Sequence, residues 1–520
     1  MKLFQKKNFK YGAFAVALTC VCVAVIIAAN VIFASLASHY FWYVDMTGEE
    51  FYDVSDEAVK LLEGVDGEND VTIYFLTDKD QLNSGAGSQN YYGAGGLWGM
   101  KYIHEIALDL ADRFDYISVD YIDVNKEGRR IREIVGDDYY DQTSQFYQYN
   151  VIVDNLLPET FDENGEPVSY YHNSRVYSRD AFYSFSYTNL SVSSFRGDYR
   201  LASAILAVTR KDPPTVYFVS GHAEAVGEYY YGQEDNAANE NYGNAVSVWQ
   251  FFRDCGYNIR KINLQYEDFE EGEAIVVIYA PKTDYLDGSI SEIEKLDKYL
   301  SQESHDLMVF MEPTLKTMPN LEGLIKKYCN ISFDQTKVKA DANSAVSVDG
   351  YTFAGDIADN DGANTLFGKI AMEGKAVFSN ARPITVEKSD NTDVLCYVGA
   401  GSSLINSESE TVSAKEDEKA VLTLTKLENE NRILCSGSTG FVSGMMMDSD
   451  VYLNRDLMFS CLAEFGDLNT PMNIQYEIIR SEGLDITLNE SRIWTIIVAI
   501  AIPLAVAAAG TIVYVRRRHS

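Results

Sequence analysis

The chain has 520 residues, of which 46% are apolar and 12% aromatic, and its formal net charge is −34. This apolar content excludes a disordered chain, because disordered chains have too few hydrophobic side chains to offset the entropy of ordering. The acidic balance excludes nucleic acid as a partner, because carboxylates repel phosphates. A chain of this length provides for roughly two to four domains of about 100–200 residues each.

The first predicted element is an apolar segment at residues 13–36 that follows a basic tail, residues 1–12. Its 24 uncharged residues would extend about 36 Å as a helix, which is enough to cross a bilayer. A cleaved signal peptide is an alternative, since the sequence Ser35-Leu36-Ala37 provides small residues at a cleavage point. Signal peptides have apolar cores of about 7–15 residues, so the length favours a retained transmembrane helix.

Strands and a helix alternate in a first α/β unit, residues 37–155. The apolar run at 71–76 predicts a buried strand, and a stripe of apolar residues from 103 to 114 predicts an amphipathic helix lying on a sheet. Residues 117–124 predict a second strand. A Tyr- and Ser-rich stretch follows at 156–200, which we interpret as an irregular or hairpin connection.

The alternation is clearer in a second α/β unit, residues 201–335. A helix from about residue 245 is expected to end at Gly256, and Ser289 with Glu292 forms a capping-box pattern for the next helix. The strands expected in this unit are the short apolar segments 215–220, 258–262, 274–278 and 307–311. This order predicts a parallel sheet covered by helices.

Residues 336–470 are more polar, and we predict a β-rich completion of the second unit. A strand at 431–436 and a helix at 454–465 close this region. A stalk, residues 471–492, then leads to a second uncharged apolar segment at 493–515, which is also long enough to span a membrane.

Basic residues flank each apolar segment on the side nearer to the end of the chain. Four lysines precede the first, and three arginines in the tail 516–520 follow the second, so both termini are expected in the cytoplasm. The other 36 of the 43 Lys and Arg lie between the segments with all 77 Asp and Glu, giving this extracytoplasmic region a net charge of −41. The predicted fold class is an α/β ectodomain of two units with a β-rich C-terminal part, flanked by two transmembrane helices in the lipid bilayer of the cell membrane.

The second membrane segment carries small residues on one helical face. Ala501, Ala505 and Ala509 are spaced by four residues, the small-xxx-small pattern that lets membrane helices pack closely. Alanine is also common in membrane helices generally, so the pattern indicates either packing against a partner helix or no particular function.

Five segments carry a family resemblance, and their order along the chain is more telling than any one of them. They are VDMTGEEFYDVSDEAVKLLEGVDGENDVTIYF at 44–75, LASAILAVTRKDPPTVYFVSGHAEA at 201–225, IVVIYAP at 275–281, NARPITV at 380–386 and RILCSGSTGFVSG at 432–444. Together they resemble the GldG family, the auxiliary subunits of ABC-2-type transporters first associated with gliding motility. The chain departs from the family's pattern at Glu303-Ser304-His305, where paired glycines are usual, and in Tyr/Gly-rich insertions around 83–99 and 229–244.

The resemblance implies a non-enzymatic, membrane-anchored extracytoplasmic subunit that works with separate permease and ATPase chains and needs no cofactor. It also implies a flavodoxin-like or glutamine-amidotransferase-like topology for the second unit, although a fold alone confers no activity. The sequence contains no Walker A motif, so ATP hydrolysis would come from another chain. Two alternatives stay open, a stand-alone surface module that binds carbohydrate or peptide, and a surface hydrolase.

A compact polar sequence, Ser220-Gly221-His222-Ala223-Glu224, follows a predicted strand of the second unit. Ligands of open α/β sheets bind at the C-terminal ends of strands, which makes Ser220, Gly221, His222 and Glu224 candidates for ligand or partner contact. His222 with Glu224 could also serve acid–base chemistry, but the chain has no GxSxG elbow. We expect a hydrogen-bonded pair that fixes the turn, and no catalytic residue.

Metal binding is not expected. The six histidines form no HxxxH or HxxEH pair, and Asp359-Asn360-Asp361 lacks the rest of an EF-hand loop, so a solvated loop is the better interpretation. The five cysteines between the membrane segments form no CxxC pair and predict mostly buried thiols.

Overall fold

The computed structural model describes residues 53–478 with gaps, and within the first apolar segment it describes Val21, Val25 and Ala28. The gaps are 86–98, 143–145, 163–166, 186–191, 225, 227–242, 313–316, 372–373, 388–390, 400, 408–409, 415–418, 450, 468–469 and 475–476. No helix among the described residues is both long and apolar enough to cross a membrane. Apart from those three residues, the predicted membrane segments, with Ala501, Ala505 and Ala509, lie outside the described residues.

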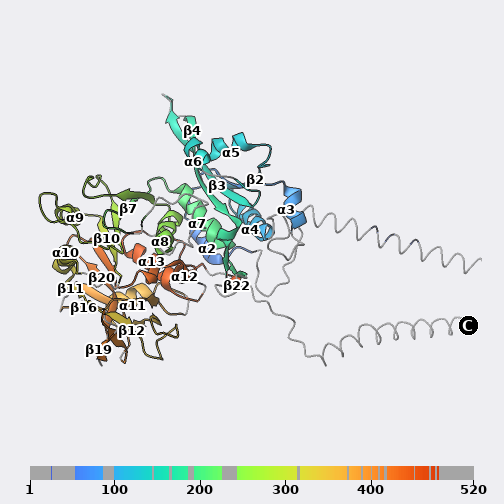
Figure 1. Ribbon diagram of the computed structural model, residues 1–520. Coiled ribbons are helices and arrows are strands. Elements are labelled where there is room, and N and C mark those ends of the chain that lie inside the picture. Colours follow the sequence, from blue (N-terminus) through green and yellow to red (C-terminus); the bar gives the residue numbers. More distant parts are fainter. Residues whose placement is uncertain are drawn as a thin grey trace, which may run out of the picture. The chain divides into compact units, whose positions relative to one another are not determined.

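The chain divides into two compact units, Met1–Glu477 and Ile478–Ser520. The first begins with a four-stranded sheet of order β2-β1-β3-β4 (Figure 1). Its elements are α2 (Asp56–Leu62), β1 (Val71–Phe75), α3 (Lys79–Gly85), α4 (Met100–Arg113), β2 (Ile117–Tyr121), α5 (Gly128–Val135), α6 (Asp137–Gln142), β3 (Asn150–Phe161) and β4 (Pro167–Ser178). The predicted strand–helix–strand order is confirmed, with β1 and β2 parallel.

Local sequence explains the start of these elements. Ser55 caps α2 by accepting a hydrogen bond from the N–H of Ala58. Acidic residues occupy the first turn of the helix, where their negative charge interacts favourably with the positive end of the helix dipole. In α4 the predicted apolar stripe, including Ile103 and Leu110, is buried. For these two helices, the capping residue and the apolar stripe expected from the sequence agree with the observed hydrogen bond and burial.

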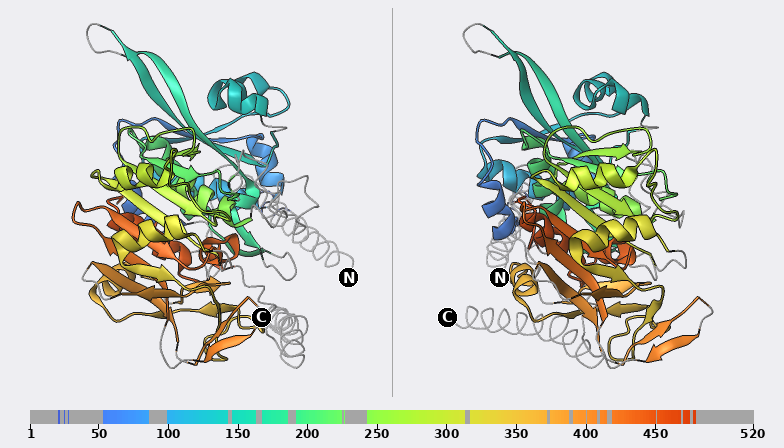
Figure 2. Two further views of the ribbon diagram at one scale, coloured as in Figure 1. Left: turned by 60° about the vertical axis from the view of Figure 1, so that its left-hand side comes forward. Right: turned by 90° about the vertical axis from the view of Figure 1, so that its left-hand side faces the viewer.

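The described residues of the stretch at 156–200 lie mostly in strands and helices, and its first part forms a hairpin, one of the two interpretations of the sequence. Strands β3 and β4 each have 12 residues and pair in an antiparallel hairpin whose outer half extends beyond the rest of the sheet (Figure 2). Both faces of that outer half meet solvent, so it lacks the alternation that marks a half-buried strand. The elements that follow are η1 (Arg179–Phe182), β5 (Tyr183–Phe185) and β6 (Val192–Phe195).

The second sheet contains the predicted parallel strands and continues into antiparallel ones. Its order is β11-β16-β20-β21-β10-β9-β7-β8, with parallel pairing from β8 to β21 and antiparallel pairing from β21 to β20. The first half of the chain region that builds this sheet contains α7 (Gly197–Thr209), β7 (Thr215–Val219), α8 (Gly243–Asp254), β8 (Asn258–Ile262), β9 (Ala274–Tyr279), α9 (Glu292–Leu300), β10 (His305–Phe310) and α10 (Pro319–Cys329). The sheet is therefore mixed, because the β-rich region joins it through β20 and β21.

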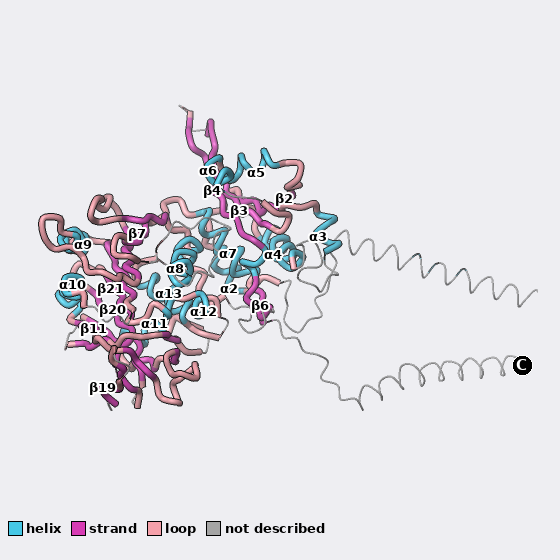
Figure 3. Tube along the Cα trace, in the orientation of Figure 1, coloured by secondary structure: helices cyan, strands magenta, loops and turns pink. Residues whose placement is uncertain are grey.

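Helices cover both faces of this sheet (Figure 3). One face buries side chains such as Val219 and Val276 against α9 and α10. On the opposite face, the ring of Phe218 contacts Trp249 and Phe252 of α8. Because both faces are covered, β9 and β10 are buried along their whole length, which is why they appear in the sequence as continuous apolar runs.

The β-rich region closes around a fully buried arginine, Arg382. Its guanidinium donates to the carbonyls of Asp334 (2.5 Å) and Phe333 (3.1 Å) and to the carboxylate of Glu322 (2.8 Å) on α10.

The elements of the β-rich region are β11 (Ile331–Phe333), β12 (Lys337–Lys339), β13 (Thr352–Ala354), β14 (Asp356–Ile357), α11 (Asp361–Phe367), β15 (Val377–Ser379), β16 (Ile384–Val386), β17 (Thr392–Val398), β18 (Ser403–Ile405), β19 (Thr411–Ala414), β20 (Lys419–Lys426), β21 (Arg432–Ser436), η3 (Gly440–Val442), α12 (Gly444–Met447), α13 (Asn454–Glu464) and β22 (Glu477–Ile478).

The start of β10 holds a buried carboxylate. Asp306 is 6% exposed, and its Oδ1 accepts a 2.6 Å hydrogen bond from the N–H of Arg432. Burial raises the pKa of Asp306 to about 7, although the contacts with Arg432 oppose that shift. Because the folded state keeps a proton that the unfolded state releases, the free energy of unfolding should fall as pH rises from about 4 to about 7.

Replacing Asp306 by Asn should therefore stabilise the protein, since the amide keeps the acceptor oxygen and never ionises. The gain should be on the order of 1–3 kcal/mol at about pH 8 and smaller at about pH 5. Thermal unfolding of the full-length protein in mild detergent at both pH values measures it, with Asp212→Asn at an exposed position as the control. An equal effect at the two pH values would contradict a raised pKa.

Candidate functional site

The candidate site lies where the strand order of the second sheet reverses. From β7 the chain passes to β8 on one side, and then to β9 on the other side of β7. The connections that leave β7 and β9 therefore diverge, and in open α/β sheets this is where a crevice forms and ligands bind. The predicted residues from Ser220 to Glu224 follow β7 directly.

The backbone of the turn needs Gly221. Its φ is +124°, and a Cβ at this position would lie 3.2 Å from the side-chain oxygen of Asn263. Ala223 also has a positive φ of 58°. Ser220 Oγ donates to the carbonyl of Ile262 at 3.1 Å, so this hydroxyl is engaged with the end of β8 rather than with a second side chain of the turn.

His222 lies in a closed cluster of four side chains. Its Nε2 hydrogen-bonds to Glu292 Oε2 at 2.9 Å, and its ring stacks on Tyr285 with ring centres 4.0 Å apart. The backbone N–H of His222 donates to Glu224 Oε2 at 2.6 Å, and the Tyr285 hydroxyl donates to Glu224 Oε1 at 3.2 Å. Glu292 Oε2 also accepts from the N–H of Leu286 at 2.8 Å. These contacts tie the turn after β7 to the start of α9.

The structure alters the expected pairing of His222. Glu224 binds the backbone of His222, and its Oε1 lies 3.4 Å from Nδ1, whereas the closer carboxylate to the imidazole is Glu292. Sequence reasoning missed this role because it assigned Glu292 to a capping box with Ser289. The N-cap of α9 is Ser291, which accepts from the N–H of Glu294. The sequence signal that could have revealed this role is the position of Glu292, in the first turn of the helix that follows β9, the parallel neighbour of β7.

Burial and charge oppose each other at His222. Burial by itself lowers the pKa of the imidazole, but hydrogen bonds and charges from Glu224 and Glu292 outweigh it, and the pKa is raised. Burial raises the pKa of Tyr285 well above its ordinary value, and the two carboxylates add to that effect. The cluster thus places the imidazole between two glutamates that favour its charged form, beside the phenol of Tyr285.

The cluster is closed to solvent. His222 is 2% exposed, Tyr285 1% and Glu292 0%, and the side chain of Glu224 is also fully buried. These side chains have the chemistry of a proton relay, and all four are buried. Their geometry therefore suits a role in fixing the crevice.

The other sequence candidates also take part in local structure. Asn360 caps α11 by accepting from the N–H of Ala363 at 2.8 Å and also donates to the carbonyl of Val394, so Asp359-Asn360-Asp361 forms a helix start. In the part of the chain that the structure describes, no three His, Cys, Asp or Glu side chains are arranged to hold a metal ion. The expectation of buried thiols is confirmed for the five described cysteines, which are all free.

Contacts join several of the five segments that carry the family resemblance. Lys211 pairs with Asp66 at 2.9 Å, and the N–H of Lys282, directly after the third segment, donates to the carbonyl of His222. The N–H of Arg382 donates to the carbonyl of Gly437, and a Cβ at Gly437 would overlap the Arg382 backbone. These contacts join segments that are far apart in the sequence.

Comparison with known proteins gives no match, either to a family model or to a curated protein.

Replacing His222 by Ala should lower the free energy of unfolding by on the order of 1–3 kcal/mol, because Glu292 would stay buried without its partner. A raised pKa means that this stabilisation is complete below about pH 6.5 and is lost as pH rises through the pKa of folded His222. Thermal unfolding of wild type and variant across this range measures it.

Tyr285→Phe is the matched control, since it removes the hydroxyl but keeps the ring that stacks on His222. It should destabilise less and without the same pH dependence. A difference between wild type and His222→Ala that stays constant with pH would argue against a charged imidazole in the cluster.

Proposed function

We propose that this chain is the extracytoplasmic, non-enzymatic auxiliary subunit of an ABC-2-type transporter, anchored in the cell membrane and working with separate permease and ATPase chains. The observation that carries this proposal is the closed crevice after β7. Where related architectures expose a ligand site, this chain buries its own His222, Glu224, Tyr285 and Glu292. A crevice filled in this way favours a scaffold that binds other proteins.

The strand order supports a flavodoxin-like topology for the second unit. The parallel part of the sheet has the spatial order β8-β7-β9-β10-β21. When these strands are numbered by their order along the chain, this reads 2-1-3-4-5, and helices cover both faces of the sheet. That is the order of the flavodoxin-like doubly wound sheet. Such a sheet confers no activity by itself, and the position of its usual site is the one that the His222 cluster fills.

The two alternatives differ in what they require. A surface hydrolase needs an accessible nucleophile beside its base, whereas Ser220 donates to the carbonyl of Ile262 and His222 is buried. A stand-alone binding module needs an exposed recognition surface. The outer β3–β4 hairpin provides one, with Tyr170 and Tyr171 about half exposed. The same surface suits contact with a transporter partner.

Purification of the native protein in mild detergent, followed by identification of the co-purifying chains, tests the proposal. A polytopic permease and an ATPase should be recovered together with it. Recovery of the protein alone, with affinity for a glycan or peptide, would replace the proposal by the stand-alone binding module. Turnover of a peptide, ester or glycoside by the purified protein would replace it by the hydrolase.

Replacing Ala505 by Leu should reduce recovery of the permease several-fold, because a larger side chain prevents close approach of the helices at the Ala501/Ala505/Ala509 face. Ala507→Leu is the matched control, since residue 507 lies about 200° around the helix from Ala505. Quantitative pull-down of both variants measures the effect. Equal recovery with Ala505→Leu and Ala507→Leu would show that this face does not hold the permease.

A further inference from the structure

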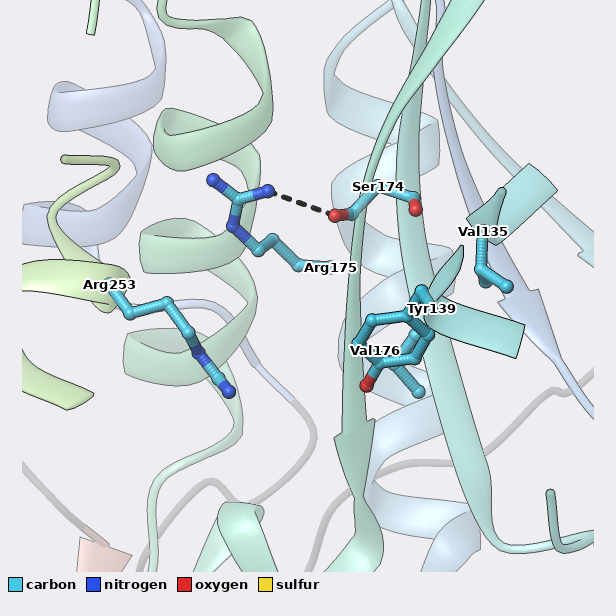
Figure 4. A pocket seen from close by; sticks show the side chains of 6 residues that line it. All are labelled: Val135, Tyr139, Ser174, Arg175, Val176 and Arg253. Carbon is cyan, nitrogen blue, oxygen red and sulfur yellow. Dashed lines mark hydrogen bonds between the residues drawn. The ribbon is translucent and has the colours of Figure 1, made fainter. Parts of the chain in front are cut away.

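The inner half of strand β4 has neighbours on both of its faces. Figure 4 shows Arg175 on one side of the strand, the side of Arg253 of α8, and Val176 on the other side with Val135 and Tyr139. Val176 is buried there. This half of the strand therefore packs as a strand inside a domain does.

The outer half of the β3–β4 hairpin extends away from these neighbours (Figure 2). Strand β1 pairs with β3 from Val151 to Asn155, so in the described part of the chain residues 157–161 have only residues 167–171 of β4 as a strand neighbour. We call these two segments the outer ribbon. Two-stranded ribbons are only marginally stable in water, so contact with a further surface would stabilise this one.

Large apolar side chains of the outer ribbon are exposed. Val168 is 66% exposed, Phe161 57%, Tyr170 53% and Tyr171 46%. Single exposed apolar side chains are ordinary at protein surfaces, whereas several on one small element mark an interaction site. Two of the four are tyrosines, a residue type enriched at protein–protein interfaces.

The charge of the outer ribbon and its tip has one sign. Residues 157–171 contain four Asp and Glu and no Lys or Arg. Glu159 accepts a 2.9 Å hydrogen bond from Ser169 Oγ, and among the described residues it forms no ion pair. A carboxylate beside tyrosine rings suits a Lys or Arg, which can pair with the carboxylate and also lie over a ring.

A second copy of the chain does not suit this surface. Two ribbons would bring carboxylates of the same charge together. The register of β3 with β4 also shifts twice, between Pro158 and Thr160 and between Thr160 and Phe161. Such irregularities twist an edge strand and disfavour pairing with the edge of another sheet.

We propose that the outer ribbon docks a basic protein partner. Lys or Arg of the partner lies against Glu159, and apolar side chains of the partner lie against Phe161, Val168 and the rings of Tyr170 and Tyr171. The occupant is defined by its chemistry, as a protein segment that carries Lys or Arg beside apolar residues. The inference rests on the residues of the hairpin and holds whether or not the partner belongs to a transporter.

Site-specific photo-cross-linking of the full-length protein in isolated native membranes tests the proposal. A benzophenone amino acid in place of Tyr170 should cross-link to a protein segment that contains Lys or Arg. The matched control is the same probe in place of Tyr266, which is 80% exposed and lies outside the hairpin. No adduct beyond that of the control, an adduct with a second copy of the chain, or an adduct at a segment without basic residues would each overturn the proposal.

The charge of Glu159 provides the second test. Glu159→Lys should lower the yield of the adduct several-fold, because repulsion replaces attraction. Raising the ionic strength from about 0.1 M to about 1 M should also lower it, because the screening length falls from about 10 Å to about 3 Å. Glu271→Lys, at an exposed position outside the ribbon, is the matched control. Equal yields from Glu159→Lys and Glu271→Lys would exclude a basic partner.

A milder variant separates charge from the local structure of the ribbon. Glu159→Gln keeps an acceptor for Ser169 Oγ and removes only the negative charge. Its yield should fall below that of wild type and of Glu271→Gln. Should Glu159→Lys disturb the ribbon, this variant decides the question, because a yield equal to that of wild type would show that Glu159 acts only through its hydrogen bond and would overturn the proposal.

Discussion

The hydrogen bond between His222 and Glu292 is the constraint on which the second unit depends. A carboxylate that is fully buried needs a charged or donating partner, because desolvation otherwise costs several kcal/mol. Glu292 finds that partner in the turn after β7 and a second donor in the N–H of Leu286. The pair therefore fixes α9 relative to β7 across the point where the strand order reverses, and the stacking of Tyr285 on the imidazole closes the space between them.

The same rule applies at other junctions of the chain. Arg382 is buried between the β-rich region and α10, where its Nε and Nη2 donate to two backbone carbonyls and to Glu322. Arg200 of α7 pairs with Asp254 of α8. Each of these arginines joins elements that are far apart in sequence, and each has a carboxylate partner. Arg175 differs from them in that its hydrogen bonds to Ser174 and Asn173 go to uncharged oxygens.

The buried cluster at the crevice bears on function. In the His222 cluster the groups suited to proton transfer are buried and hydrogen-bond to one another, which supports the proposal of a non-enzymatic subunit.

The sequence by itself determined the elements whose burial repeats with the period of a helix or strand. Strands such as β1 and β9, and helices such as α4 and α8, lie within a few residues of where local apolar patterns and Gly256 predicted them, because those signals act between neighbours in the chain. Only the tertiary structure decided which side chains meet. Glu292 is 70 positions from His222, and no local rule distinguishes a capping glutamate from one that crosses to another strand. The length of the β3–β4 hairpin was likewise not determined by the sequence, since its outer half is not packed on the rest of the sheet and carries no burial pattern.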